Sequence, residues 1–125
     1  MAPLPIRSYR DLIVWQRAKE LATISLQLRW ALPAHLRLII GDQILRCAWS
    51  IPSNIAEGRG RLSKADNVRH LTIARGSLQE LESHLTMAVE FELLRAEDAA
   101  AAIRLCAEVG RMLNAQIRKI GNRHL

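Results

Sequence analysis

Two stretches of the chain carry mostly apolar residues at alternating intervals of three and four positions, a spacing that few structures besides long helices can use. The first stripe comprises Val14, Ala18, Leu21, Ser25, Leu28 and Leu32, and the second comprises Leu71, Ala74, Leu78, Leu81, Leu85 and Ala88. Side chains at these intervals share one face of an α-helix, which a partner helix can cover. We therefore predict helices over about residues 9–32 and 63–94.

Two further helices are predicted in the remaining sequence. Residues 41–58 are apolar on most sides, and Pro52 lies inside them. An interior proline removes one backbone hydrogen bond at a cost of about 3 kcal/mol, so we expect a kink there. Residues 97–121 begin with acidic side chains and end with basic ones, as the helix macrodipole favours.

Four amphipathic segments with short connections predict an all-α fold, an antiparallel up-down four-helix bundle formed by a single domain, residues 1–125. Apolar side chains also flank both stripes, outside the face that one bundle can bury. They are Ile13, Ile24 and Ala31 beside the first stripe, and Ile73, Met87 and Phe91 beside the second. These are either tolerated surface residues or, as we expect, part of a homo-oligomer interface.

The sequence indicates a cytoplasmic protein. Its first residues lack the charged and apolar segments of a signal peptide, and no apolar run approaches the roughly 18 residues of a membrane-spanning helix. Cys47 and Cys106 stand alone within helical patterns. We therefore expect free buried thiols rather than a disulfide or a zinc knuckle.

Basic residues outnumber acidic ones by 18 to 12, and all but Lys19, Lys64 and Lys119 of the basic residues are arginines. The planar guanidinium group suits phosphate contacts, which favours a nucleic-acid partner. Codon supply in a GC-rich genome would produce the same excess of arginine. Composition alone therefore leaves both explanations open.

The motifs predict no enzymatic activity, no metal and no cofactor. No glutamate is followed three residues later by a histidine, as a di-iron bundle requires, and phosphate-loop and nucleophile-elbow motifs are absent. Arg29 with His35, and Arg118 with His124, match the arginine-then-histidine spacing of one helical ribonuclease superfamily. Because a chain so rich in arginine contains such pairs by chance, we discount them.

Arg59, Arg61 and Lys64 form the densest basic cluster, on a predicted loop and helix start. Arg46 and Arg69 extend it if the second and third helices are neighbours. Basic side chains and the free N–H groups of a helix start can hold a phosphate, so we predict a nucleic-acid-binding site here. The alternative is a solvated turn between two helices.

Three polar side chains of the second helix, Ser50, Asn54 and Glu57, are predicted to have a structural role. The helix is otherwise suited to burial, and buried polar groups need hydrogen-bond partners. Arg75 and Ser77 on the third helix are candidate partners. Such contacts would tie the second helix to the third.

Three segments resemble a known family. They are Ser8–Leu12 with Trp15, the segment Ser50–Gly58 (SIPSNIAEG) and the segment Ile73–Leu81 (IARGSLQEL). They are similar to the signatures of the 23S ribosomal RNA intervening-sequence protein family, whose members are small bacterial four-helix-bundle proteins. The resemblance runs over nearly the whole chain.

The resemblance implies a homopentamer without enzymatic activity. Relatives of the family include the accessory protein of diversity-generating retroelements, a pentameric barrel with a basic surface that binds nucleic acid and pairs with a reverse transcriptase. A reverse transcriptase is therefore one protein partner that the resemblance suggests. The chain departs from the family pattern in residues 34–42, which are apolar here, and at Cys47, where the family has an arginine.

We accordingly expect a non-catalytic, oligomeric protein of undefined biological role that binds RNA or DNA through phosphate contacts. The alternative is a structural or partner-docking module that binds no nucleic acid. A salt series distinguishes them, because phosphate contacts weaken steeply as salt rises and apolar docking does not.

Overall fold

The computed structural model describes residues 5–121, which contain helices and turns and no strand. The predicted all-α class is therefore confirmed. In chain order the elements are η1 (Tyr9–Asp11), α1 (Ile13–Ala31), η2 (Ala34–Leu36), η3 (Arg37–Gly41), α2 (Asp42–Arg59), α3 (Lys64–Glu90) and α4 (Ala96–Gly121). The elements η1 and η2 are single 3-10 turns, and η3 is a π-helical turn that leads directly into α2.

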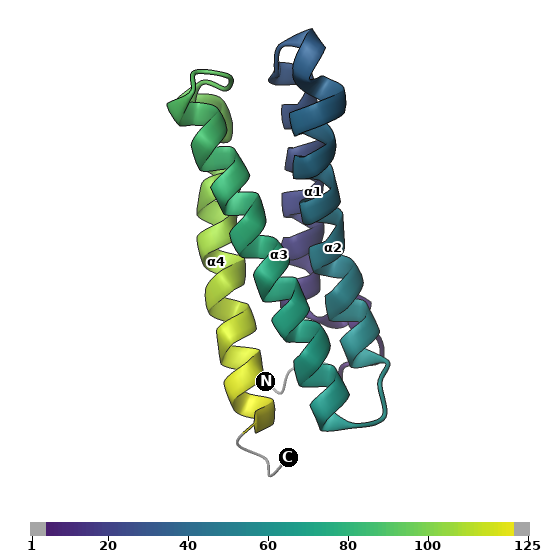
Figure 1. The fold of residues 1–125 in the computed structure, drawn as a ribbon. Coiled ribbons are helices and arrows are strands. Elements are labelled where there is room, and N and C mark those ends of the chain that lie inside the picture. Colours follow the sequence, from purple (N-terminus) through teal and green to yellow (C-terminus); the bar gives the residue numbers. More distant parts are fainter. Residues whose placement is uncertain (1–4, 122–125) are drawn as a thin grey trace.

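The four long helices lie side by side and run alternately up and down (Figure 1). Each helix packs against two others, α1 against α2 and α4, and α3 against α2 and α4. Short connections between antiparallel neighbours produce this arrangement. The start of α1, the α2–α3 connection and the end of α4 therefore share one end of the bundle, and the α3–α4 turn lies at the other (Figure 1).

Both stripes face the interior. All their side chains are buried, and Leu21, Leu81 and Leu85 are completely so. Ser25, the polar member, donates its hydroxyl hydrogen to the Leu21 carbonyl at 2.8 Å, so its burial leaves no unpaired donor. The other two helices complete the core with Ile44, Ala48, Ile51, Ile55, Ala102, Cys106, Val109 and Leu113.

The ends of α1 and α3 differ from the predicted bounds. Ser8 and Asp11 form a capping box at the short turn η1. Leu12 then has extended backbone, and α1 begins only at Ile13 and not at residue 9. At its other end α3 stops at Glu90 rather than near residue 94. The chain turns back there, which lets Leu94 cover the end of the core with only 4% of its surface exposed.

The junction between α1 and α2 depends on a close approach at Gly41. A Cβ atom there would lie 2.8 Å from Cγ of Arg29, so the missing side chain leaves space for the arginine to pass. Arg29 then pairs with Asp42 in the first turn of α2, with 3.0 Å between Nη2 and Oδ1. Further along, α2 is helical on both sides of Pro52. The helix is thus not broken at the proline, and the expected kink stays a prediction.

Large apolar side chains remain on the surface, as predicted for the residues that flank the two stripes. Ile13, Ile73, Met87 and Phe91 are exposed, while Ile24 packs partly against the core. The most prominent of the others are Trp30, Trp49, Leu38, Ile39 and Leu62. No helix within residues 5–121 is both long and apolar enough to cross a membrane.

Candidate nucleic-acid interface

The α2–α3 connection carries three of the predicted basic residues at one end of the bundle (Figure 1). Arg59 is the last residue of α2, Arg61 lies in the connection, and Lys64 is the first residue of α3. All three are exposed to solvent. Arg69 follows one turn further along α3 and is also exposed. The fold thus brings four of the five predicted contact residues to one place.

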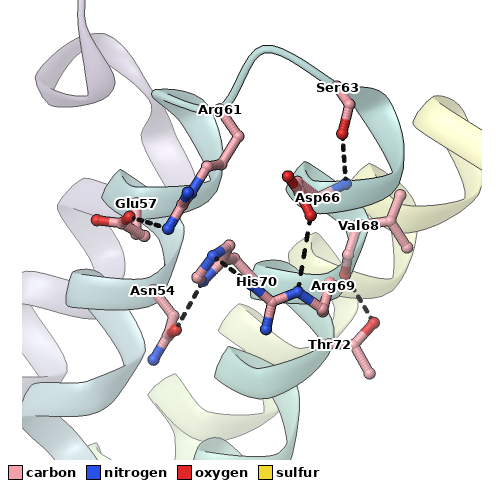
Figure 2. Close-up of polar contacts among 9 residues, drawn as sticks. All are labelled: Asn54, Glu57, Arg61, Ser63, Asp66, Val68, Arg69, His70 and Thr72. Carbon is pink, nitrogen blue, oxygen red and sulfur yellow. Dashed lines mark hydrogen bonds and ion pairs between the residues drawn. The ribbon is translucent and has the colours of Figure 1, made fainter.

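Two of these arginines have acidic neighbours (Figure 2). Arg61 forms an ion pair with Glu57, with 2.6 Å between Nη2 and Oε1, and Arg69 lies 3.8 Å from Asp66, Nε to Oδ1. All four side chains are largely exposed. Exposed pairs contribute at most about 1 kcal/mol and weaken as salt screens them. A phosphate group can therefore compete with either carboxylate for its arginine.

The start of α3 is fixed by its cap and by close packing against α2. The Ser63 hydroxyl accepts a hydrogen bond from the backbone N–H of Asp66 at 3.1 Å (Figure 2), which satisfies one of the free donors of this helix start. A Cβ atom at Gly58 would lie 2.8 Å from Oδ1 of Asn67 and 3.1 Å from Cβ of His70. Glycine at this position therefore allows the two helix ends to approach, which holds the basic residues together.

A pocket of about 310 Å³ opens beside this connection, between the ends of three helices and the N-terminal segment. Three of its lining side chains are basic, Arg59 from α2, Lys64 from α3 and Lys119 from α4, and Arg59 also donates to the Ile6 carbonyl at 3.5 Å. The other residues that line it are Ile6, Leu12, Ile55, Asn67, Leu71, Gln116 and Ile120. No carboxylate occurs among these described lining residues. The pocket therefore presents positive charge to a ligand beside an apolar wall.

Lys119 was not among the predicted contact residues. The sequence signal was its position in the basic last turn of α4, which we explained by the helix macrodipole alone. The up-down arrangement places that turn beside the start of α3. Its contribution to the pocket could be inferred only once the neighbours of α4 were known.

Arg46 does not belong to this group. It lies 13 positions before Arg59 on α2, or about 20 Å along the helix at 1.5 Å per residue. Its side chain is exposed beside Cys47. The predicted extension of the basic cluster to Arg46 is therefore wrong as a matter of geometry, whereas Arg69 does lie near the cluster.

Hydrogen bonds between α2 and α3 stand next to the basic end. The hydroxyl oxygens of Ser50 and Ser77 are 2.8 Å apart, and Nδ2 of Asn54 donates to Oγ of Ser50 at 3.0 Å. On its other side, Oδ1 of Asn54 is 3.2 Å from Nδ1 of His70, which is buried (Figure 2). These contacts form a continuous polar tie between the two helices, as expected for Ser50, Asn54 and Ser77.

The two partners of the His70 ring assign the roles of its nitrogens as donor and acceptor. Nη2 of Arg69 lies 3.3 Å from Nε2 of His70, and a guanidinium group can only donate (Figure 2). The Nε2 atom must therefore accept, which leaves the ring hydrogen on Nδ1, where it is donated to Asn54. The imidazole thus connects an exposed arginine of the basic end to the polar tie.

Two residues predicted for the tie have other contacts. Glu57 is about half exposed and forms an ion pair with Arg61, which follows it four residues later in the chain. Arg75 donates to Oδ1 of Asn114 at 3.0 Å, and so connects α3 with α4 instead of α2. The two corrections have different causes. Glu57 shares the helix face of Ser50 and Asn54 but lies next to the α2–α3 connection, where Arg61 is its partner. Arg75 lies on the side of α3 opposite Ser77, where it meets α4.

The residues that could suggest catalysis are the two cysteines and the arginine–histidine pairs. Cys47 and Cys106 are buried and free, as predicted. Burial raises the pKa of both thiols to about 12, and for Cys47 the nearby Glu80 carboxylate adds to the effect. Both are therefore protonated at neutral pH and are poor nucleophiles. Of the arginine–histidine pairs, Arg29 is paired with Asp42, and His124 lies outside the described residues.

Comparison with known proteins shows similarity over most of the chain. The model of the family described as 23S rRNA-intervening sequence protein matches residues 10–115. The crystal structure of a protein with unknown function from the S23 ribosomal protein family, from Bacteroides thetaiotaomicron, is similar in fold, with a TM-score of 0.77 and 25% sequence identity. That match covers 84% of this chain and 98% of the other. No curated protein matches the chain.

Proposed function

Because the chain belongs to the 23S rRNA-intervening sequence protein family, we propose that it is a non-catalytic, self-associating protein that binds RNA or DNA through its basic end. The binding surface consists of Arg59, Arg61, Lys64, Arg69 and Lys119. It contacts phosphates and reads little or no base sequence. The family description, which refers to ribosomal RNA, makes RNA the first ligand to test.

The pocket lined by Arg59, Lys64 and Lys119 is the observation that carries this proposal. Three basic side chains from three helices line it, and none of the described lining residues is acidic. A phosphate can contact several of them at once, while its sugar or base lies against the apolar wall. The exposed ion pairs of Arg61 and Arg69 leave these arginines available to neighbouring phosphates.

Binding is best measured by the fluorescence anisotropy of a labelled single-stranded RNA between about 50 and 200 mM salt. We expect the affinity to fall steeply across this range, because bound phosphates release counterions. The double variant Arg59→Gln/Lys119→Gln should bind more weakly and reduce the slope of log K against log salt by about 2, one for each lost contact.

A matched control removes the same charge elsewhere. Arg104→Gln/Arg111→Gln changes two exposed arginines on α4 that are not among the residues lining the pocket and instead line a separate hollow. This variant should keep nearly the affinity and salt slope of the unchanged protein. Equal losses in both double variants would mean that only net charge matters, and the pocket would then have no specific role.

The absence of catalysis is tested with the same labelled RNA. After long incubation with excess protein, with and without added divalent metal, we expect the RNA to remain full length on a denaturing gel. Cleavage that persists through purification and is abolished by His35→Ala would overturn this part of the proposal.

Self-association is supported by the apolar surface between α1 and α2. A groove of about 470 Å³ is lined there by Tyr9, Trp15, Leu26, Trp49 and Pro52, with five further residues. Trp49 is 66% exposed in the single chain, which is unusually high for a tryptophan side chain on a protein surface. A homopentamer would have five times the 14.1 kDa of one chain, which light scattering measures directly. Trp49→Glu should lower that mass.

The same groove supports a second candidate, a module that docks a protein partner and binds no nucleic acid. Aromatic side chains in such a groove are typical anchors of protein interfaces. RNA affinity that is absent at low salt, or that does not change across the salt series, would favour docking over phosphate binding.

A further inference from the structure

Three side chains suited to metal binding meet on α2 and α3, away from the basic end of the bundle. They are Cys47 on α2 and Glu80 and His84 on α3. The sulfur, a carboxylate oxygen and a ring nitrogen all lie within 4.8 Å of one another. We propose that Cys47, Glu80 and His84 bind a zinc ion that links α2 to α3.

The helical spacing explains why two of the ligands face the same point. Glu80 and His84 are four residues apart on α3, so their side chains lie on one face of the helix, one turn apart. The distance from Nε2 of His84 to Oε1 of Glu80 is 3.9 Å. Cys47 approaches both from the facing helix and is 4% exposed. Ligands from two helices would make a bound ion a cross-link.

The ring nitrogen of His84 supplies an independent indication. Its Nε2 atom is buried and has no hydrogen-bond partner among the described residues. Buried polar atoms nearly always have a partner, so an unpaired one requires an explanation. The Glu80 oxygen, at 3.9 Å, is too distant for a hydrogen bond but suitable for a shared ion. A buried thiol that serves only as a small core residue would explain Cys47 but would leave this nitrogen unexplained.

The set of donors selects zinc among common cations. A thiolate, an imidazole and a carboxylate are all ligands that Zn²⁺ accepts in four-coordinate sites, whereas Mg²⁺ and Ca²⁺ prefer oxygen alone. In a tetrahedral site with bonds of about 2.0 to 2.3 Å, ligand atoms lie about 3.3 to 3.7 Å apart, so small side-chain rotations suffice. The Glu80 side chain is 60% exposed, which leaves a fourth position open to water. Binding requires the thiolate, so the ion displaces the thiol proton.

The proposal is tested with cobalt as a spectroscopic substitute for zinc. The full chain, without a histidine tag, is treated with a chelator, dialysed and titrated with Co²⁺. We expect thiolate-to-cobalt charge-transfer absorption that saturates at one ion per chain and disappears when Zn²⁺ is added. Cys47→Ser should abolish this absorption. Loss of a residue that only hydrogen-bonds to a metal ligand weakens metal binding roughly 10- to 100-fold. His84→Gln and Glu80→Gln remove ligands themselves and should weaken Co²⁺ binding at least as much.

Cys106→Ser is the matched control, because Cys106 is an equally buried free thiol outside the cluster. It should keep the cobalt spectrum, and Zn²⁺ should raise the Tm of this variant and of the unchanged protein but not that of Cys47→Ser. Far-ultraviolet circular dichroism checks that each variant is folded; should Cys47→Ser be unfolded, the two α3 variants decide the question. The proposal is wrong if no charge-transfer absorption appears, or if it requires Cys106 instead of Cys47. Neither result bears on RNA binding, which uses other residues.

Discussion

The contact between α2 and α3 contains buried and half-buried polar side chains, whereas the polar contact between α1 and α4 lies at the surface. Between α2 and α3, Ser50, Asn54 and His70 take part in buried or half-buried hydrogen bonds. Between α1 and α4, the ion pair Arg17–Glu108, at 3.0 Å, lies on the partly exposed surface. A hollow of about 540 Å³ is also lined by residues of these two helices.

The difference concerns how strictly each contact fixes the position of its helices. A hydrogen bond is short and directional, so the polar tie is satisfied at only one alignment of α2 with α3. Apolar contacts and an exposed ion pair tolerate small displacements at little cost. We therefore expect α2 and α3 to form the rigid half of the bundle. The basic residues and the proposed zinc ligands both lie mainly on that half.

The largest effect should come from Asn54→Ala, which removes the centre of the polar tie. The buried Nδ1 of His70 would lose its acceptor, and an unpaired buried donor costs about 1–3 kcal/mol. Urea unfolding at a fixed protein concentration measures the change in the free energy of unfolding. Asn114→Ala is the control, since Asn114 is exposed and should lose less than about 0.5 kcal/mol. Equal losses would show that the tie contributes no more than a surface contact.

A somewhat smaller loss is expected for Gly58→Ala. The new methyl group would lie 3.1 Å from both the carbonyl oxygen of Asn67 and Cβ of His70, so α2 and α3 would have to separate. Overpacking of this kind costs about 1–3 kcal/mol, of which the better helix propensity of alanine recovers about 1 kcal/mol.

The same substitution at Gly76 on α3 should have the opposite sign. A Cβ atom there would meet nothing within 4 Å, so only the propensity gain of about 0.5–1 kcal/mol remains. Both substitutions replace glycine with alanine inside a helix, so urea unfolding curves of Gly58→Ala and Gly76→Ala compare the packing at the two positions directly. A stabilised Gly58→Ala protein would mean that the two helix ends are not closely packed.

The smallest effect is predicted for Glu108→Gln on the α1–α4 side. Its ion pair with Arg17 is partly exposed, and Arg17 also pairs with Glu20 at 2.9 Å. The loss should be at most about 1 kcal/mol and should vanish in high salt. A loss as large as that of Asn54→Ala, independent of salt, would remove the distinction between the two contacts.

The core could be predicted from the sequence because it depends on spacing alone. Every position of the stripes from Val14 to Leu32 and from Leu71 to Ala88 is buried. Helix ends were predicted less well, for a physical reason. The capping box of Ser8 and Asp11 starts only the short turn η1, so α1 begins at Ile13 and not at the predicted residue 9.

For the candidate sites too, the sequence showed residues that are close in the chain but not contacts between different helices. Arg59, Arg61 and Lys64 lie close together in the chain, so their cluster was visible in the sequence. Lys119 reaches the pocket from a different helix, and His70 reaches Asn54 across the α2–α3 contact. Such partners depend on which helix faces which and at what alignment. The cluster of Cys47, Glu80 and His84 was missed for this reason too.

The shared end of the bundle has a consequence for the order in which the protein acquires its surfaces. The pocket is lined by Ile6 and Leu12 from the start of the chain and by Lys119 and Ile120 from the end of α4. During synthesis, α2 and α3 can pair while α4 is still inside the ribosome, but the pocket cannot yet exist. A nascent chain would therefore not hold a phosphate there until its fourth helix has docked. Ligand binding at this pocket would thus report completed folding.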